Sequence, residues 1–244
     1  MRTGNPTLSS KTFRVEYADS NAMTISGTVN KTAILLLLVA MTSIWSWKKV
    51  MALPDFSAMA PWMFGGLIVG FIFAMITVFK PTAAAITAPI YALAEGVFLG
   101  AISAVMELQY PGIVFQAITL TFGTLFALLA AYKSGMIKAT ENFKLGITAA
   151  TGGIFFIYLI SMVMGFFGVH IPLIHESGLI GIGFSLFVVV IAALNLVLDF
   201  DFIEQGAERG APKYMEWYGA FGLLVTLVWL YIEILRLLSK LRSR

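Results

Sequence analysis

The chain has 244 residues, of which 59% are hydrophobic and only 12% are charged; its formal net charge is +3 and it contains no cysteine. A soluble domain has about 25% charged residues, so this chain lacks the polar side chains that would cover its surface in water. The composition therefore predicts an integral membrane protein. The absence of cysteine excludes disulfides, thiolate metal sites and cysteine nucleophiles. The 16 Lys and Arg residues lie between apolar runs rather than in one patch, which argues against nucleic-acid binding.

The chain begins with a polar segment, residues 1–30, that is rich in Gly, Ser and Thr. It is too long and too mixed for the charged start of a secretory signal, and the first apolar run ends in "SIWSWKK" rather than in a small-residue cleavage site. We therefore expect residues 1–30 to form a polar tail. Residues 31–241 are expected to form a transmembrane domain that begins with a retained helix.

Seven apolar stretches follow in chain order, and each has about the 20 residues that a helix needs to cross a membrane. They cover residues 31–49, 57–79, 82–106, 112–132, 145–168, 178–200 and 216–238. Most links between them are short, so consecutive helices should pack antiparallel as neighbours. A β-barrel would need alternating segments of about ten residues, which the sequence lacks. The predicted fold is an all-α polytopic membrane protein of seven helices.

Two sequence features bear on how these helices are arranged. Glycines recur at four-residue spacing, as in Gly66 with Gly70 and Gly96 with Gly100, which favours close approach of helix backbones in lipid. Ten Lys and Arg residues fall on the N-terminal side of the bundle and six on the other, which favours a cytoplasmic N-terminus. The basic C-terminal end favours the opposite orientation. If one run is re-entrant, both ends of the chain could lie in the cytoplasm.

Glu95 lies near the middle of the third run, in "ITAPIYALAEGVFLGAISAV". An isolated charge in hydrocarbon is costly, and no Lys or Arg lies in the interior of any run. We expect Glu95 to face the bundle interior and to hold a proton, or to share a proton or a cation with another carboxylate. The alternative is a protonated packing residue, hydrogen-bonded to a neighbouring helix.

The sixth run ends in a second group of acids. Asp199 follows Asn195 by four residues, so both lie on one face of a helix and Asp199 is a candidate for an inner site. A simple role at the helix end is the alternative. Asp201 points to the opposite side, so the two aspartates cannot bind one ion from a regular helix. With Glu204 and Glu208, Asp201 is expected to form a solvated acidic rim.

The last run carries two acids with ordinary explanations. Glu216 begins the helix, where an acid suits the positive end of the helix dipole. Glu233 precedes Arg236 by three residues, which fits an ion pair within the helix. His170 and His175 lack the spacing of a helical metal pair, and no phosphate-binding, dinucleotide-binding or nucleophile motif is present. We therefore predict neither enzymatic activity nor a resident cofactor.

Four segments resemble one known family. "AEGVFLGAIS" resembles the Glu-Gly-x-x-x-Gly signature in the third helix of the Bax inhibitor-1 (transmembrane BAX inhibitor motif) family. "LNLVLDFDFIEQG" is similar to the sixth helix of that family, and "LVWLYIEILRLL" resembles its final helix. The resemblance covers residues 28–241, and "SGTVNKTAILLLLVAMTSIWSW" resembles the start of the bacterial branch.

This resemblance implies a fold in which a central last helix is wrapped by the other six. It also implies a pH-dependent calcium leak, controlled by two carboxylates in the last two helices. Asp199 corresponds to the sixth-helix carboxylate, with Asp201 as the fallback, and Glu95 to the third-helix acid. The chain departs from the family at Thr226, where the second carboxylate is expected. Either Glu95, Glu216 or Glu233 replaces it, or this branch lacks that gate.

Together these patterns predict a pH-modulated cation leak, for calcium, in the inner membrane of a bacterium. The predicted ion pathway and pH-sensing residues are Glu95, Asp199, Asp201 and Glu216. Calcium takes 6–8 oxygen ligands at a tight site, so Asp199 and Glu95 would bind it only weakly and transiently. The alternative is a non-conducting regulator that binds other membrane proteins, such as a membrane protease or its substrates. A proton-coupled transporter would predict an inverted repeat, and none is evident.

Overall fold

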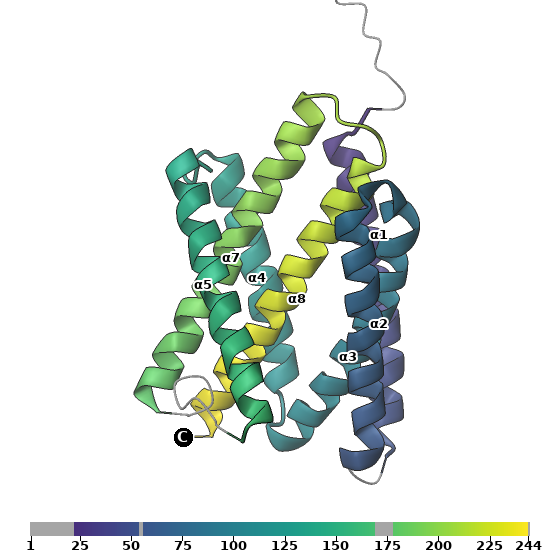
Figure 1. Ribbon diagram of the computed structural model, residues 1–244, viewed down its shortest axis with the longest axis vertical. Helices are drawn as coiled ribbons and strands as arrows, with labels where there is room; N and C mark the ends of the chain where they lie inside the picture. Colours follow the sequence, from purple (N-terminus) through teal and green to yellow (C-terminus); the bar gives the residue numbers. More distant parts are fainter. Residues whose placement is uncertain (1–21, 54–55, 169–177, 244) are drawn as a thin grey trace, which may run out of the picture.

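The computed structural model describes residues 22–53, 56–168 and 178–243 and is built of helices (Figure 1). Seven helices in these ranges are long and apolar enough to cross a membrane, as predicted. They are α1 (Ile25–Met51), α2 (Phe56–Phe79), α3 (Ala84–Gln109), α4 (Ile113–Lys133), α5 (Glu141–Phe166), α7 (Leu179–Glu208) and α8 (Met215–Arg242), with a 3₁₀ turn η2 (Pro81–Ala83) before α3. Residues 1–21 of the expected tail, His170 and His175 lie outside the described residues.

The first helix begins earlier than the apolar run does. Thr24 caps α1 by accepting a hydrogen bond from the Gly27 amide at 3.0 Å. Just before it, Met23 is buried, and its amide donates to the Ala211 carbonyl at 2.7 Å. These contacts with the segment before α8 order the polar residues 25–30 as helix, so the hydrophobic pattern alone placed the helix start too late.

Helix α7 continues eight residues beyond the expected end at residue 200. Its last turns are supported by side-chain hydrogen bonds at i,i+4 spacing, from Gln205 to Asp201 at 2.6 Å and from Arg209 to Gln205 at 2.7 Å. The helix ends before Gly210, whose φ of 64° lies in the left-handed region. Asp199 therefore lies inside the helix and not at its end.

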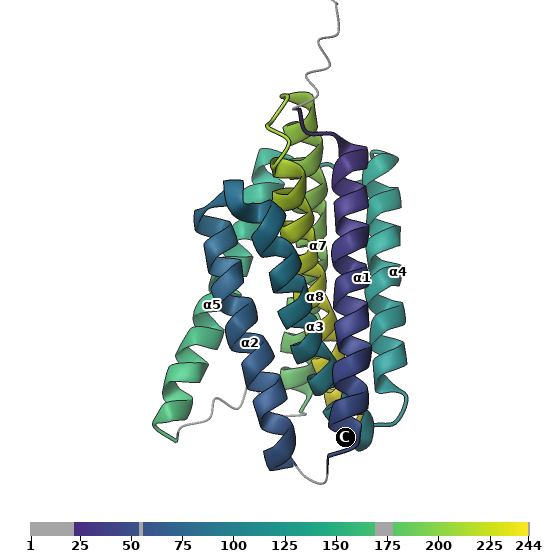
Figure 2. The same ribbon diagram turned by 90° about the vertical axis from the view of Figure 1, so that its right-hand side faces the viewer.

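Helix α8 is the centre of the bundle. It packs directly against α7, α1, α4 and α3 (Figures 1 and 2). Its buried side chains include Leu224, Leu230 and Leu235, and they account for much of the apolar core. The other six helices were expected to surround α8. Two of them do so at a distance, because α2 packs chiefly on α3, and α5 packs chiefly on α7.

The predicted glycine contacts hold α3 between α1 and α2. A Cβ on Gly96 would lie 2.6 Å from the Val39 carbonyl oxygen, and one on Gly66 would lie 2.7 Å from the Phe98 amide nitrogen. Helix α1 also hydrogen-bonds to α3, since the Ser43 hydroxyl donates to the Gly96 carbonyl at 3.0 Å. Both glycines are thus required by the close backbone approach that van der Waals packing in lipid favours.

Candidate functional site

Asp199 lies where α7 contacts the central helix α8. The Thr226 hydroxyl of α8 donates a hydrogen bond to its carboxylate. Gly222 of α8 also faces this carboxylate but has no side chain; a Cβ at this position would lie 3.9 Å from Asp199 Oδ1. Asp199 Oδ2 is buried and has no hydrogen-bond partner among the described residues. A buried carboxylate oxygen without a partner is costly unless it takes up a proton or a cation.

Asn195 does not share this site, although the two residues are one turn apart. Its side-chain amide donates to the Thr151 hydroxyl of α5 at 2.8 Å and to the Ile191 carbonyl at 2.9 Å. Asn195 therefore fastens α7 to α5, and Asp199 obtains its hydrogen bond from α8.

Asp201 points away from Asp199, as the helical spacing predicts. It forms an ion pair with Lys144 of α5, with 2.9 Å between Nζ and Oδ2. A pocket of about 450 Å³ lies here, and its polar lining includes Lys144, Asp201, Gln205 and Arg209. Nearby, the Tyr132 hydroxyl donates to exposed Glu204. These contacts form a polar rim at the C-terminal end of α7.

Glu95 is buried, with an exposed fraction of 6%, and lies at the contact of α3 with α2. A Cβ on Gly70 of α2 would be 2.9 Å from Glu95 Oε2, so this glycine provides the room for the carboxylate. One turn earlier on α3, Tyr91 packs edge-on against Phe221 of α8, with 5.1 Å between ring centroids. Glu95 and Asp199 thus lie on different helix contacts, and the structure does not bring them into one site.

Glu216 is fully buried and joins the beginnings of α1 and α8. It accepts hydrogen bonds from the Thr24 amide at 2.9 Å and the Thr24 hydroxyl at 2.8 Å. It also forms ion pairs with Lys31 and, at 2.9 Å, with Lys213. Its position in the first turn of α8 agrees with the expected helix-dipole role. The contacts with α1 were not predicted, because nothing in the local sequence links Glu216 to residues 24 and 31.

Glu233 is buried and belongs to a partly buried network near the other end of α8. Its predicted ion pair with Arg236 is present at 3.1 Å. In addition, the Tyr158 hydroxyl of α5 donates to both carboxylate oxygens at 3.1 Å, and Arg236 Nη1 lies 2.6 Å from that hydroxyl. The network ties α5 to α8. Sequence reasoning missed Tyr158, which carries no spacing signal relative to Glu233.

These arrangements determine which groups could hold a cation. Among the described residues, no three His, Cys, Asp or Glu side chains are close enough to hold a metal ion. Asp199 offers its carboxylate and the neighbouring Thr226 hydroxyl, whereas Glu216 is already neutralised by two lysines. Weak, transient binding at Asp199 is the calcium chemistry this geometry is compatible with.

A bundle of seven apolar helices with carboxylates buried along its central helix defines a polytopic helical membrane protein. A family model described as Bax inhibitor 1 like matches residues 5–243. The chain therefore belongs to the Bax inhibitor-1-like family, and the resemblance noted in the sequence is confirmed. Comparison with curated proteins and with solved structures gave no match. Assignment to the bacterial branch stays a prediction.

Proposed function

We propose that this protein is a non-enzymatic, pH-modulated cation leak of a bacterial inner membrane, that calcium is the ion, and that Asp199 controls the flux. The observation that carries the proposal is the buried Asp199 Oδ2, which lacks a hydrogen-bond partner between α7 and α8. Such an oxygen is stabilised by a proton when flux is low and by a passing cation when flux is high.

The pH response rests on one carboxylate in this proposal. Thr226 occupies the position at which the family resemblance places a second acid, and its hydroxyl faces Asp199. A hydroxyl donates a hydrogen bond but does not share a titrating proton between two acids. Protonated Asp199 offers a cation no charge, whereas ionised Asp199 does. Flux should therefore rise with pH.

The polar pocket at the end of α7 is the aqueous end of the proposed path. Asp201 and Lys144 line it, and Leu198, next to Asp199, lies at its wall. Leu196, three residues before Asp199 on α7, is fully buried in the apolar core. Conduction thus requires a small separation of α7 from α8, which ionisation of Asp199 would favour by drawing water to the carboxylate.

The test is calcium flux into liposomes that contain the purified protein, from pH 6 to pH 8. Wild type should leak calcium and leak more at the higher pH, and Asp199→Asn should abolish that pH dependence. Glu208→Gln is the matched control, because it neutralises an exposed acid of the same helix that does not line the pocket, and it should keep the wild-type profile. Wild-type flux no greater than that of empty liposomes would refute the proposal.

The alternative is a non-conducting regulator that binds other membrane proteins. The glycine pairs expected to form its binding faces are already occupied, because Gly66 and Gly70 contact α3 and Gly96 and Gly100 contact α1. Helix α5 instead leaves Gly152 and Gly153 open on its surface. A protein that does not conduct but co-purifies with a stoichiometric membrane partner would favour this alternative.

A further inference from the structure

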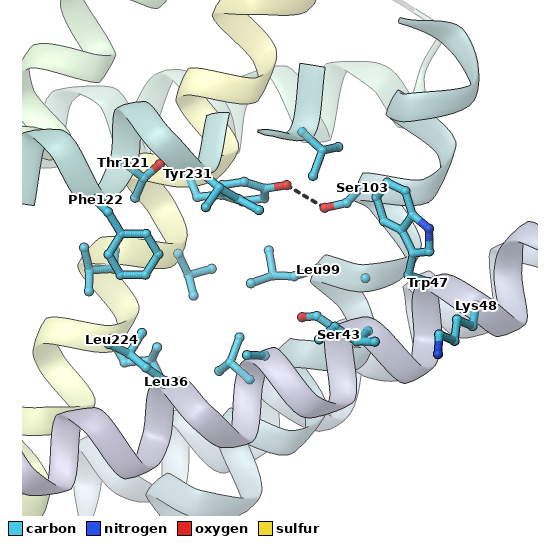
Figure 3. A pocket seen from close by; sticks show the side chains of 18 residues that line it. Leu36, Ser43, Trp47, Lys48, Leu99, Ser103, Thr121, Phe122, Leu224 and Tyr231 are labelled. Atoms are coloured by element: carbon cyan, nitrogen blue, oxygen red, sulfur yellow. Dashed lines mark hydrogen bonds between the residues drawn. The ribbon is translucent and has the colours of Figure 1, made fainter. Parts of the chain in front are cut away.

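A groove of about 540 Å³ opens between α1, α3, α4 and α8, away from the acids described above (Figure 3). Its volume lies within the roughly 300–1,000 Å³ typical of small-molecule sites. The groove exists because α1 and α4 lie on the same side of α8 (Figure 2) but pack on α3 and α8 and not closely on each other. Its open side therefore faces the hydrocarbon of the membrane.

The lining of the groove suits a hydrocarbon chain. Apolar side chains from all four helices point into it, among them Leu36, Leu99 and Leu224 (Figure 3). The polar groups of Ser103 and Tyr231 are hydrogen-bonded to each other, with 2.6 Å between their oxygens. Because these two hydroxyl groups are hydrogen-bonded to each other, they do not require a polar group on a ligand in the groove.

The length and the end of the groove indicate which hydrocarbon chain fits. The lining residues on α1 extend from Leu36 to Lys48, which is a rise of about 18 Å in a helix. One leaflet of the hydrocarbon layer is about 15 Å deep. Lys48 is exposed in the last turn of α1, next to Trp47, and the two residues line the same end of the groove (Figure 3). In a transmembrane helix this last turn is expected to lie near the membrane surface. A lysine at that level attracts lipid phosphates, and a Trp anchors at the interface.

We propose that this groove holds an acyl chain of an anionic phospholipid from the leaflet at the C-terminal end of α1, and that Lys48 binds the phosphate of its headgroup. The lipid would occupy the space between α1 and α4 as part of the folded protein. This proposal is independent of conduction through Asp199, because none of the acids in the ion path lines the groove.

Native mass spectrometry of the detergent-purified protein tests the proposal, with phosphatidylglycerol and phosphatidylcholine of identical chains added in turn. Ala40→Trp fills the groove from the exposed face of α1 and should remove the retained lipid. Leu37→Trp is its control, since Leu37 is exposed on α1 outside the groove and the lipid should remain bound. Ile118→Trp, on the α4 wall, provides a second filling variant if Ala40→Trp does not fold.

The headgroup contact is tested separately. Lys48→Ala should weaken phosphatidylglycerol binding about fivefold while leaving phosphatidylcholine binding unchanged. Lys49→Ala removes the neighbouring exposed lysine, which does not line the groove, and should have no such effect. Equal binding of the two lipids by wild type, equal losses in both lysine variants, or lipid retention in both groove-filling variants would overturn the proposal.

Discussion

Asp199 and Thr226 meet where α7 packs on α8, and the contact combines a carboxylate with a hydroxyl. The Thr226 hydroxyl donates one hydrogen bond to the Asp199 carboxylate, while Oδ2 of that carboxylate has no hydrogen-bond partner among the described residues. The identity of the residue at position 226 therefore decides how many acids titrate in this contact. That makes it the most informative single position for the proposed pH response.

Thr226→Asp should make the leak depend much more steeply on pH than it does in wild type. Two carboxylates in one buried contact cannot both ionise readily, so they share a proton until the pH is high. Calcium flux from pH 6 to pH 8 measures the change. Thr226→Val keeps the shape of the side chain without adding an acid and serves as the control. A Thr226→Asp profile that overlays the wild type would contradict the prediction.

Gly70→Ala should lower the thermal unfolding temperature, because the new Cβ would lie 2.9 Å from Glu95 Oε2 and displace the buried carboxylate. Thermal unfolding in detergent measures the loss. Gly65→Ala is the control, since a Cβ there meets nothing within 4 Å. The loss should shrink in a Glu95→Ala background. Equal losses in both backgrounds would show that Glu95 is not the group displaced.

At the scale of the helices, two acids join α8 to its neighbours at opposite ends. Glu216 holds the beginning of α1, and Glu233 holds α5 through Tyr158. The local sequence explained them within α8, as a dipole partner and as an i,i+3 ion pair. Glu216 was also predicted for the ion path, and both acids were candidates to replace the carboxylate missing at position 226. Their local roles are present, but their interhelical contacts explain why the two side chains are fully or almost fully buried.

Tyr158→Phe should reduce the free energy of unfolding by about 1–3 kcal/mol, because it leaves buried Glu233 and partly exposed Arg236 without the hydroxyl between them. Unfolding in denaturant measures the loss. In the double variant Tyr158→Phe/Glu233→Gln, the total should be smaller than the sum of the single effects, since both changes act on one network. Additive effects would mean that Tyr158 stabilises α5 by packing alone.

At the scale of the whole molecule, the seven helices alternate in direction, so the beginnings of α1 and α8 lie at one end and their last residues at the other (Figure 1). Among the described residues, the end with the start of α1 has seven Lys and Arg residues, against five at the other end. This difference favours a cytoplasmic location for the N-terminal end.

Single cysteines can test this orientation cleanly, because the chain has no cysteine of its own. A cysteine at Met136, exposed between α4 and α5, should be shielded from a membrane-impermeant thiol reagent added outside intact cells. A cysteine at Lys49, at the other end of α1, should react. Reaction at position 136 with protection at position 49 would reverse the orientation.

The sequence by itself determined the membrane class, the seven helices and the family, since these follow from hydropathy summed over about 20 residues and from local motifs. It also indicated that Glu95 and Asp199 lie within apolar helices. Only the tertiary structure decided that Glu95 faces Gly70, that Asp199 faces Thr226, and that the two acids occupy separate helix contacts. The reason is physical: helical periodicity gives the direction of a side chain around its own axis. The residue that meets it depends on how helices distant in the sequence pack together.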